Sequence, residues 1–218
     1  MKKLQSPQER IVSIVKKYCE EDPLNFVIDS VRDYVREDID NSILKCNKCE
    51  INSVRSITKG PANAPVMVIG ETVYKEQVGS DKEYVYPLDN AEGYNIFLDA
   101  FPYRDDGVFY INTVNCLFEE RNIPSKTEVY NCSEYVYRSI DIVRPNLIIL
   151  MGSIPLNLFK KSPINQSRGG WIDIKGIPAM PTYHPQFILN MDNLKSREIT
   201  EEYIKLFYRD IKTASKIL

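Results

Sequence analysis

Four short apolar runs, each typical of a buried β-strand, alternate with helical patterns in residues 65–218. They are rich in β-branched and aromatic residues and cover 66–69, 108–114, 147–151 and 177–183. Apolar residues at helical spacing lie between and after these runs, at about 94–101, 125–143, 155–159 and 198–217. Strands that alternate with helices predict right-handed crossovers and a parallel sheet covered on both faces. We therefore expect an α/β fold: a three-layer α/β/α sandwich around a central, mainly parallel four-stranded sheet.

The N-terminal part of the chain has a different pattern, without strand-like runs. Apolar residues at helical spacing occur within 7–19 and again from 23 to about 40, and each set predicts an amphipathic helix. We interpret residues 1–43 as an N-terminal helical extension and residues 44–218 as the main domain. Packing of the extension against that domain is the simpler role, and binding of a partner protein is the alternative.

Length and composition fit one ordinary globular core. The chain has 218 residues, of which 43% are hydrophobic and 27% charged. Its formal net charge of −2 argues against a strongly basic, non-specific nucleic-acid binder, although it leaves room for a local basic cleft. The sequence has no run of 18 apolar residues and no apolar segment typical of a signal peptide near its start. We expect an intracellular, cytoplasmic monomer that does not insert into a membrane.

Four of the five cysteines have a spacing that suits a metal centre. Cys46 and Cys49 form a close pair, and Cys116 and Cys132 follow singly, which gives a full set of four thiolate ligands. In a reducing compartment a metal site is a better use of these thiols than a disulfide framework. Zinc suits the number of ligands, but zinc modules more often use two close pairs. Cys19 is left over.

Polar residues and a glycine stand at the ends of the four predicted strands, where open α/β sheets bind their ligands. They are Glu71, Asn112, Gly152 and His184. His184 is the only histidine in the chain and lies between Pro181 and Pro185, whose rings restrict the backbone. Such rigidity suits an accurately aimed hydrogen-bond donor, and we therefore expect a functional histidine.

These motifs resemble those of the uracil-DNA glycosylase superfamily, and within it the iron–sulfur group called family 4, over about residues 44–211. The cysteine motifs carry much of the match: Cys46-x2-Cys49 is followed by Ile51 and Arg55, and Cys116-x15-Cys132 has Arg121, Pro124 and Glu128 between its two cysteines. The other matching motifs are Gly70-Glu71, Asn112, Arg168-Gly169 before Trp171, and the segment 181–185. The resemblance implies a [4Fe–4S] cluster on the four cysteines and a site that hydrolyses the N-glycosidic bond of uracil in DNA.

The resemblance also implies roles for individual residues. Asn112 offers a donor and an acceptor that match uracil, whereas cytosine reverses the pattern. His184 would donate a hydrogen bond to the departing base, and Glu71 or Glu76 would oppose the positive charge of the sugar or orient the attacking water. Further expected contacts are those of Gly70 with the substrate and of Arg168, Pro185 and Gln186 with DNA.

Two departures from the family pattern affect the base pocket. The loop from Gly70 to Glu76 lacks the Pro-Gly turn of the iron–sulfur enzymes. Tyr74 instead falls where other enzymes of the superfamily have a tyrosine that blocks the methyl group of thymine. A Pro-Phe pair, whose ring stacks on the flipped base, is replaced by Pro87-Leu88. We expect Leu88 to contact the substrate, with stacking that is weak or supplied by another ring such as Tyr86.

Two classes of function follow. The first is an active glycosylase that flips uracil, or a related modified pyrimidine, out of single- or double-stranded DNA for base-excision repair. The second is a catalytically degenerate iron–sulfur protein with the same fold, which acts as a DNA-binding or replication-partner subunit. The altered loop at 70–76 and the N-terminal helices, a possible surface for a replication or repair protein, favour the second class. The histidine and asparagine motifs favour the first, which we take as the main hypothesis.

Overall fold

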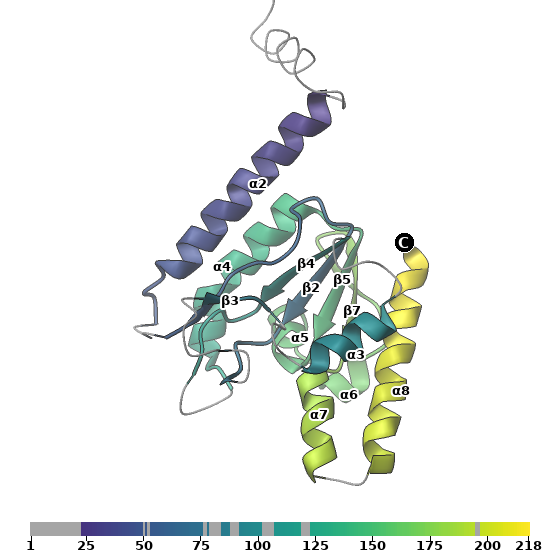
Figure 1. The fold of residues 1–218 in the computed structure, drawn as a ribbon. Coiled ribbons are helices and arrows are strands. Elements are labelled where there is room, and N and C mark those ends of the chain that lie inside the picture. The colour runs from purple at the N-terminus through teal and green to yellow at the C-terminus, as the bar shows by residue number, and fades with distance from the viewer. Residues whose placement is uncertain are drawn as a thin grey trace, which may run out of the picture.

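A five-stranded sheet with helices on both faces forms the centre of the molecule (Figure 1). The computed structural model describes residues 23–49, 51, 53–75, 78, 84–87, 92–101, 107–118, 123–194 and 197–218. In spatial order the strands are β4 (Val108–Asn112), β2 (Val66–Gly70), β5 (Leu147–Met151), β7 (Ile177–Thr182) and β6 (Ile172–Ile174). The first four are parallel to one another, and β6 pairs with β7 in the antiparallel direction.

The four predicted strands are confirmed, and together they make the parallel part of the sheet. Every residue of β2, β4 and β5 is buried, as expected for strands covered on both faces. The edge strand β6 was not predicted because its three residues form no apolar run. It reaches β7 through a tight turn at Lys175 and Gly176, where both residues have a positive φ, of 55° and 82°.

One face of the sheet is covered by α2 (Pro23–Leu44), α4 (Lys126–Val143) and α5 (Ser153–Phe159). Alternate strand residues point to this face, among them Met67 and Ile69 of β2, and pack with Val136 and Ile140 of α4. Helix α4 begins with a capping box, in which the Ser125 hydroxyl accepts from the backbone of Glu128 and the Glu128 carboxylate accepts from the backbone of Ser125.

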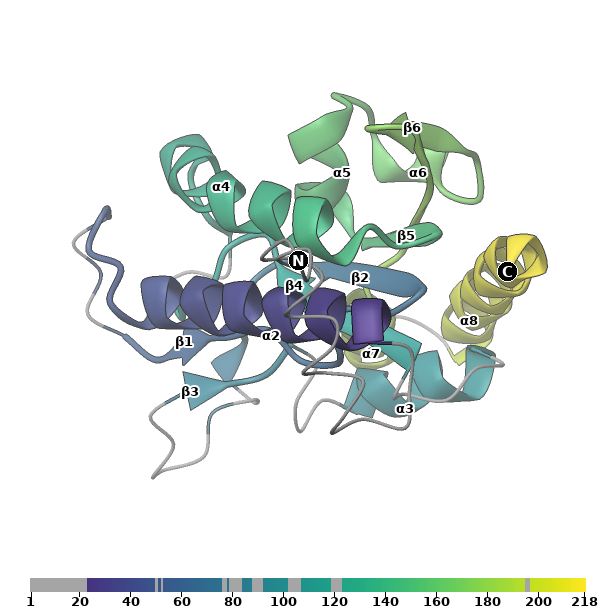
Figure 2. The ribbon, with the colours of Figure 1, turned by 90° about the horizontal axis from the view of Figure 1, so that it is seen from above.

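The opposite face is covered by α3 (Glu92–Ala100), α7 (Pro185–Leu194) and α8 (Arg197–Ala214). Val66 and Val68 of β2 point to this side, where Phe97 of α3 and Phe207 of α8 pack against the sheet. Figure 2 shows the sheet between α4 on one side and α3 and α7 on the other. The expected three-layer sandwich is confirmed. The remaining short elements are β1 (Arg55–Ser56), β3 (Tyr84–Val85), α6 (Ile164–Ser167) and η3 (Ser215–Ile217).

Helix α2 is docked at one end and exposed at the other. Its C-terminal half enters the core through Ile39 and Ile43, and the Asp40 carboxylate accepts hydrogen bonds from Thr58 N and Oγ1, both 2.8 Å long. Its N-terminal half extends past the end of α4 (Figure 1). The helix predicted from residue 23 therefore ends later than expected, at Leu44, inside the main core. The division of the chain at residue 43 stays a prediction.

The first predicted helix, at 7–19, and Cys19 lie outside the described residues. Within the described ranges, no helix is both long enough and apolar enough to cross a membrane.

Candidate active site

The carboxyl ends of β2, β4, β5 and β7 bring the predicted polar residues to one edge of the sheet. Gly70 of β2 lies beside Asn112 of β4 in the register, and Met151 of β5 lies beside Thr182 of β7. Glu71 and His184 follow directly in the adjoining loops. This is the edge at which parallel α/β sheets place their ligands.

The Glu71 carboxylate is held by three hydrogen bonds. One oxygen accepts from Ile154 N at 3.2 Å and from Ser153 Oγ at 3.3 Å, and the other accepts from the Tyr74 hydroxyl at 2.9 Å. The carboxylate fits because the neighbouring residue is Gly152, whose φ is 102° and where an added Cβ would lie 2.3 Å from Glu71 Oε1. A fixed negative charge is therefore built into the junction of β2 and β5.

His184 is buried and held in one tautomer. Its side chain belongs to a residue that is only 4% exposed, and Nδ1 accepts a hydrogen bond from Gln186 N at 3.1 Å. Because Nδ1 accepts, the proton of the neutral ring lies on Nε2, which becomes a donor. Burial lowers the pKa of His184, and the negative charge of Glu71 acts in the opposite, weaker sense. The Tyr74 ring lies against the imidazole, with 5.3 Å between the ring centroids.

Asn112 is equally well enclosed, on the other side of β2. The residue is 3% exposed, and its Nδ2 donates to Ser56 Oγ at 3.3 Å. Its Oδ1 lies over the α-carbon of Gly70, where an added Cβ would be 2.4 Å away. Glycine at position 70 is thus required by the close approach of the asparagine side chain. The Thr113 hydroxyl donates to Gly70 O at 2.7 Å and ties the two strand ends together.

A small cavity of about 160 Å³ opens between Glu71 and His184. Its other lining residues are Gly152, Ser153, Ile164, Tyr183 and Phe187. The cavity therefore has a carboxylate and an imidazole on its walls and aromatic rings beside them. Asn112 does not line this cavity. Tyr74 contacts two residues of the cavity wall, Glu71 through its hydroxyl and His184 through its ring.

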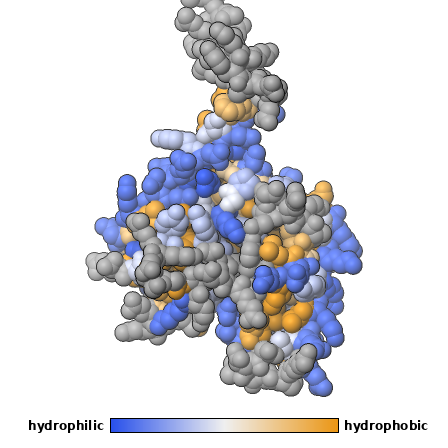
Figure 3. All heavy atoms as spheres, in the orientation of Figure 1, coloured by the Kyte–Doolittle hydropathy of each residue, from blue (hydrophilic) through white to orange (hydrophobic). Residues whose placement is uncertain are grey.

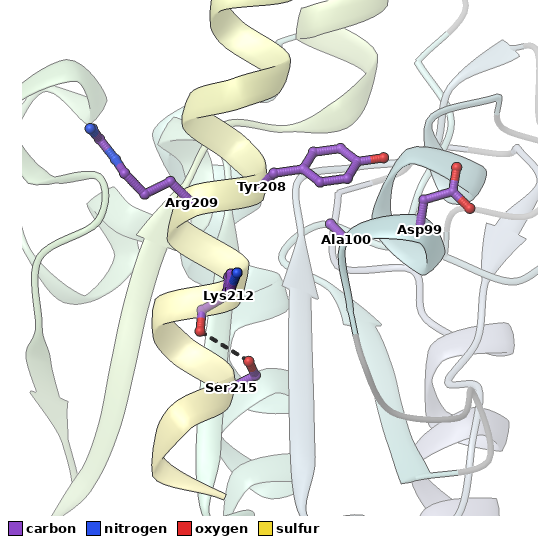
Figure 4. Close-up of a pocket in the computed structure, with 6 residues that line it drawn as sticks. All are labelled: Asp99, Ala100, Tyr208, Arg209, Lys212 and Ser215. Atoms are coloured by element: carbon purple, nitrogen blue, oxygen red, sulfur yellow. Dashed lines mark hydrogen bonds between the residues drawn. The ribbon is translucent and has the colours of Figure 1, made fainter.

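A larger pocket, of about 530 Å³, lies away from the strand ends, between α3 and α8 (Figure 4). Tyr208 extends from α8 toward α3, where Asp99 lies, whereas Arg209 points to the other side of α8. Burial, followed by the charge of Asp99, raises the pKa of Tyr208. The polar groups of this pocket do not converge on a common point, so its size alone does not make it the functional site.

Arg168, Pro185 and Gln186 were predicted to contact DNA, and the structure places each beside His184 or its strand. The Arg168 guanidinium pairs with Asp210 and donates to Leu206 O at 3.0 Å, and only 9% of its side chain is exposed. Asp210 also accepts from the Thr182 hydroxyl at 2.9 Å, which fixes the end of β7. Pro185 is the first residue of α7, and the backbone N–H of Gln186 donates a hydrogen bond to His184 Nδ1. Their contact with DNA stays a prediction.

Glu76 and Leu88, together with Arg121, lie outside the described residues. The described part of the loop places Glu71 beside His184, and the choice between Glu71 and Glu76 as the charged group stays a prediction.

The four cysteines come from three segments that meet beside α4. Cys46 and Cys49 follow α2, Cys116 follows β4, and Cys132 lies in the second turn of α4. A hydrogen bond with Cys132 lowers the pKa of Cys116, and Asn131 Nδ2 donates to Cys49 Sγ at 3.3 Å. All four thiols are free of disulfides.

Arg55 supports the first cysteine pair through the backbone. Its guanidinium donates to Cys46 O at 3.1 Å and to Ile51 O, and its own backbone bridges to Cys116. Across the described ranges, no three His, Cys, Asp or Glu side chains are close enough together to form a metal site as they stand. The chemistry of the donor set, four free thiols in adjoining segments, nevertheless suits a thiolate-bound metal centre.

Among the described residues, Ser56, Ser153 and Asp210 make contacts in the site that the sequence did not predict. Each is a single polar residue that no periodic pattern marks, although Ser153 directly follows Gly152 and Asp210 lies in the predicted helix at 198–217. Their functional contacts arise only when distant strands become neighbours.

The model of the uracil DNA glycosylase superfamily matches residues 57–212. The chain belongs to this superfamily. A type-4 uracil-DNA glycosylase from Sulfurisphaera tokodaii is 31% identical over 185 residues, which cover 78% of this chain and 81% of that protein. The type-4 uracil-DNA glycosylase from Thermotoga maritima is 25% identical over 183 residues, 80% of this chain and 93% of the relative. The corresponding enzyme from Saccharolobus solfataricus is 29% identical over 177 residues, 75% and 81% of the two chains.

The family prediction is thereby confirmed, and so is the prediction of a hydrolase of the uracil-DNA glycosylase type.

Proposed function

We propose that this protein is a DNA glycosylase that hydrolyses the N-glycosidic bond of uracil, or of a related modified pyrimidine, in DNA. The observation that carries the proposal is the pairing of a neutral, Nε2-protonated His184 with the fixed Glu71 carboxylate across one cavity. The two groups suit the two charges that form when the bond between sugar and base breaks. The substrate is DNA, in single- or double-stranded form, and the protein acts as a monomer.

Bond cleavage moves the electron pair of the C1′–N1 bond onto the base. The base leaves as a uracil anion, with negative charge shared by O2, and the sugar becomes positively charged. His184 Nε2–H would donate to O2, and a neutral imidazole suffices because a fixed donor is needed rather than a strong acid. Water then attacks C1′ and loses a proton to the solvent, and the uracil anion takes up one proton from the solvent, which gives an abasic site and free uracil.

Glu71 is suited to stabilise the sugar because its position is fixed before the reaction. Its three hydrogen bonds, from Ser153, Ile154 and Tyr74, leave it little freedom to move. A charge that is already oriented costs no reorganisation when the oxocarbenium ion forms. Tyr74 would in addition block the 5-methyl group of thymine with its ring, and Asn112 would read the Watson–Crick edge of the flipped base.

We further propose a [4Fe–4S] cluster held by Cys46, Cys49, Cys116 and Cys132, with zinc as the alternative. When bound, such a group supplies a covalent cross-link between segments and no step of the hydrolysis. The segments it would join are the loop after α2, the loop after β4 and the start of α4. This chain contributes Arg55 and Asn131, whose hydrogen bonds orient the cysteine loop.

The test is an excision assay on single- and double-stranded oligonucleotides that contain one uracil, followed by alkaline cleavage of abasic sites. We expect cleavage at the uracil position by wild-type protein and a loss of most activity in His184→Ala. Matched oligonucleotides with thymine at the same position are the control. Folded wild-type protein that releases no uracil from either form would overturn the proposal.

A second candidate is a non-catalytic subunit that binds DNA and a replication or repair protein. It is favoured by one observation, the exposed apolar side chains of Leu24, Ile28 and Val31 on the N-terminal half of α2. Figure 3 shows this apolar surface at that end of the helix. Binding to uracil-containing DNA without excision would support this function instead.

A further inference from the structure

An asparagine side chain by itself does not tell uracil from cytosine. Uracil presents an acceptor at O4 and a donor at N3, whereas cytosine presents a donor at N4 and an acceptor at N3. Rotation of the amide by 180° about its last bond exchanges its oxygen and nitrogen, and so converts a match for one base into a match for the other. A selective site therefore needs a group that holds the amide in one orientation.

Ser56 is placed to be that group. Its hydroxyl oxygen lies 3.3 Å from Asn112 Nδ2, and both residues are buried, with exposures of 0% and 3%. The Ser56 hydroxyl hydrogen is directed to Ile57 O, at 3.5 Å, so the oxygen presents a lone pair to Asn112. An amide turned by 180° would bring Oδ1 against the hydroxyl oxygen. The hydroxyl could then donate to Oδ1 only by turning its single hydrogen away from Ile57 O, so the turned orientation costs the contact with that carbonyl.

The serine is itself fixed to the segment that directly follows β4, the strand that carries the asparagine. Ser56 N donates to Asn115 O at 2.9 Å, and the Cα partners Ser56 and Val85 join β1 to β3. On the other side of the amide, Oδ1 rests over Gly70. The orientation of Asn112 thus depends on one hydroxyl in a rigid position, and the second hydrogen of Nδ2 stays available for a base.

We infer that Ser56 is a specificity-determining positioning residue: its hydroxyl holds the Asn112 amide in the orientation that matches uracil and rejects cytosine. The inference rests on the proposed function of the same site. It assigns a role to a residue of β1 that lies far from Asn112 in the sequence and does not touch the base.

The test measures base preference in binding, so that the poor leaving ability of cytosine does not mask the effect. The probes are single-stranded oligonucleotides with one 2′-fluoro-2′-deoxyuridine or one 2′-fluoro-2′-deoxycytidine, whose fluorine slows cleavage. For wild-type protein we expect tighter binding of the uracil probe. Ser56→Ala should reduce the ratio of the two affinities by about tenfold or more, the scale of one net hydrogen bond in a buried site.

Two further variants separate the hydroxyl from the shape of the side chain. Ser56→Thr keeps the hydroxyl and should keep the wild-type ratio of affinities for the two probes. Ser56→Val has nearly the shape of the threonine variant but no hydroxyl, and it should lower this ratio. The matched control is Ser139→Ala in α4, because Ser139 is also fully buried but its hydroxyl has no partner among the described residues. This variant should bind both probes as wild-type protein does.

The inference would be overturned if folded Ser56→Ala and Ser56→Val kept the wild-type ratio of affinities for the uracil and cytosine probes. It would also be overturned if Ser139→Ala lowered this ratio as much as the Ser56 variants do. Should Ser56→Ala fail to fold, the threonine and valine pair gives the same decision. Failure of the proposed function is detected separately, as the absence of uracil excision by wild-type protein.

Discussion

At the scale of the residue, His184 can be assigned a chemical state from one backbone contact. Gln186 N donates to Nδ1, so the ring offers Nε2–H to the cavity. Replacement by alanine should lower the single-turnover rate of uracil excision by about 10²-fold or more, as loss of a preorganised transition-state donor does. Affinity for an uncleavable uracil analogue should change much less. Equal losses in rate and affinity would show instead that His184 positions the DNA.

The same histidine gives a prediction for the dependence of stability on pH. Burial lowers the pKa of His184 below its ordinary 6.5, so the unfolded chain binds this proton more tightly than the folded protein. The contribution of His184 to the free energy of unfolding is complete above pH 6.5. It falls as the pH drops through 6.5 and toward the lower pKa of His184 in the folded protein. Asp40 and Asp210, whose pKa values are raised by burial, act in the opposite sense at lower pH. Thermal melts at pH 7 and pH 5 should show a larger loss for wild-type protein than for His184→Asn.

Tyr74 has two separable contacts, a hydroxyl on Glu71 and a ring beside His184. Tyr74→Phe keeps the ring and removes one of the three hydrogen bonds to Glu71, so we expect uracil excision to slow by about tenfold while thymine stays rejected. Tyr74→Ala should also relax the exclusion of 5-substituted bases, but only in part, because fit around one methyl group is worth about 1 to 3 kcal/mol. If wild-type protein excised thymine as fast as uracil, the Tyr74 ring would not be the group that excludes the methyl group of thymine from the base pocket.

The position of a residue in the site was predictable where the residue stands at the end of a predicted strand, and not where it supports another residue. His184, Asn112 and Glu71 stand at strand ends in short motifs, so position and residue type together identify them. Ser56 and Asp210 act through a neighbour that is distant in the sequence, and nothing local marks them. Arg168 pairs with Asp210, an ion pair that the sequence did not predict, and its contact with DNA stays a prediction.

At the scale of the element, α2 owes its docking to a few contacts near its C-terminus. Asp40→Ala removes both hydrogen bonds to Thr58 and leaves a buried N–H without an acceptor. We expect a loss of about 1 to 3 kcal/mol in the free energy of unfolding, measured by urea denaturation. The control is Asp38→Ala on the same helix, whose ion pair with Arg138 lies on the surface and should contribute well under about 1 kcal/mol. Equal effects of the two changes would contradict this account.

The elements themselves followed closely from periodicity. Strands buried on both faces gave continuous apolar runs, and α4 was delimited by its capping serine. Among the elements that were missed, β6 and α6 are short, and α7 begins at a proline within a motif already assigned to function. β6 and α6 pack against β7, and α7 packs against α3 and α8, so their formation depends on these tertiary contacts rather than on their own pattern.

At the scale of the whole molecule, the proposed cluster would tie the start of the domain to the loop after β4. Protein purified without oxygen should be brown, with broad absorption near ~400 nm typical of thiolate-bound iron–sulfur centres. Cys116→Ser or Cys132→Ser should lose the colour and lower the melting temperature, whereas Cys19→Ser should retain both. Colourless wild-type protein with stoichiometric zinc would establish the alternative metal.

The strand order has a consequence for how this protein is made. Asn112 ends β4 and Glu71 directly follows β2, and both strands are made early in synthesis. His184 follows β7, and Asp210 of α8 secures β7 through Thr182. A chain synthesised only as far as α7 would contain Glu71, Asn112 and His184 but would lack the Asp210 carboxylate that holds the end of β7. We therefore expect the site to become ordered only after α8 has docked against β7.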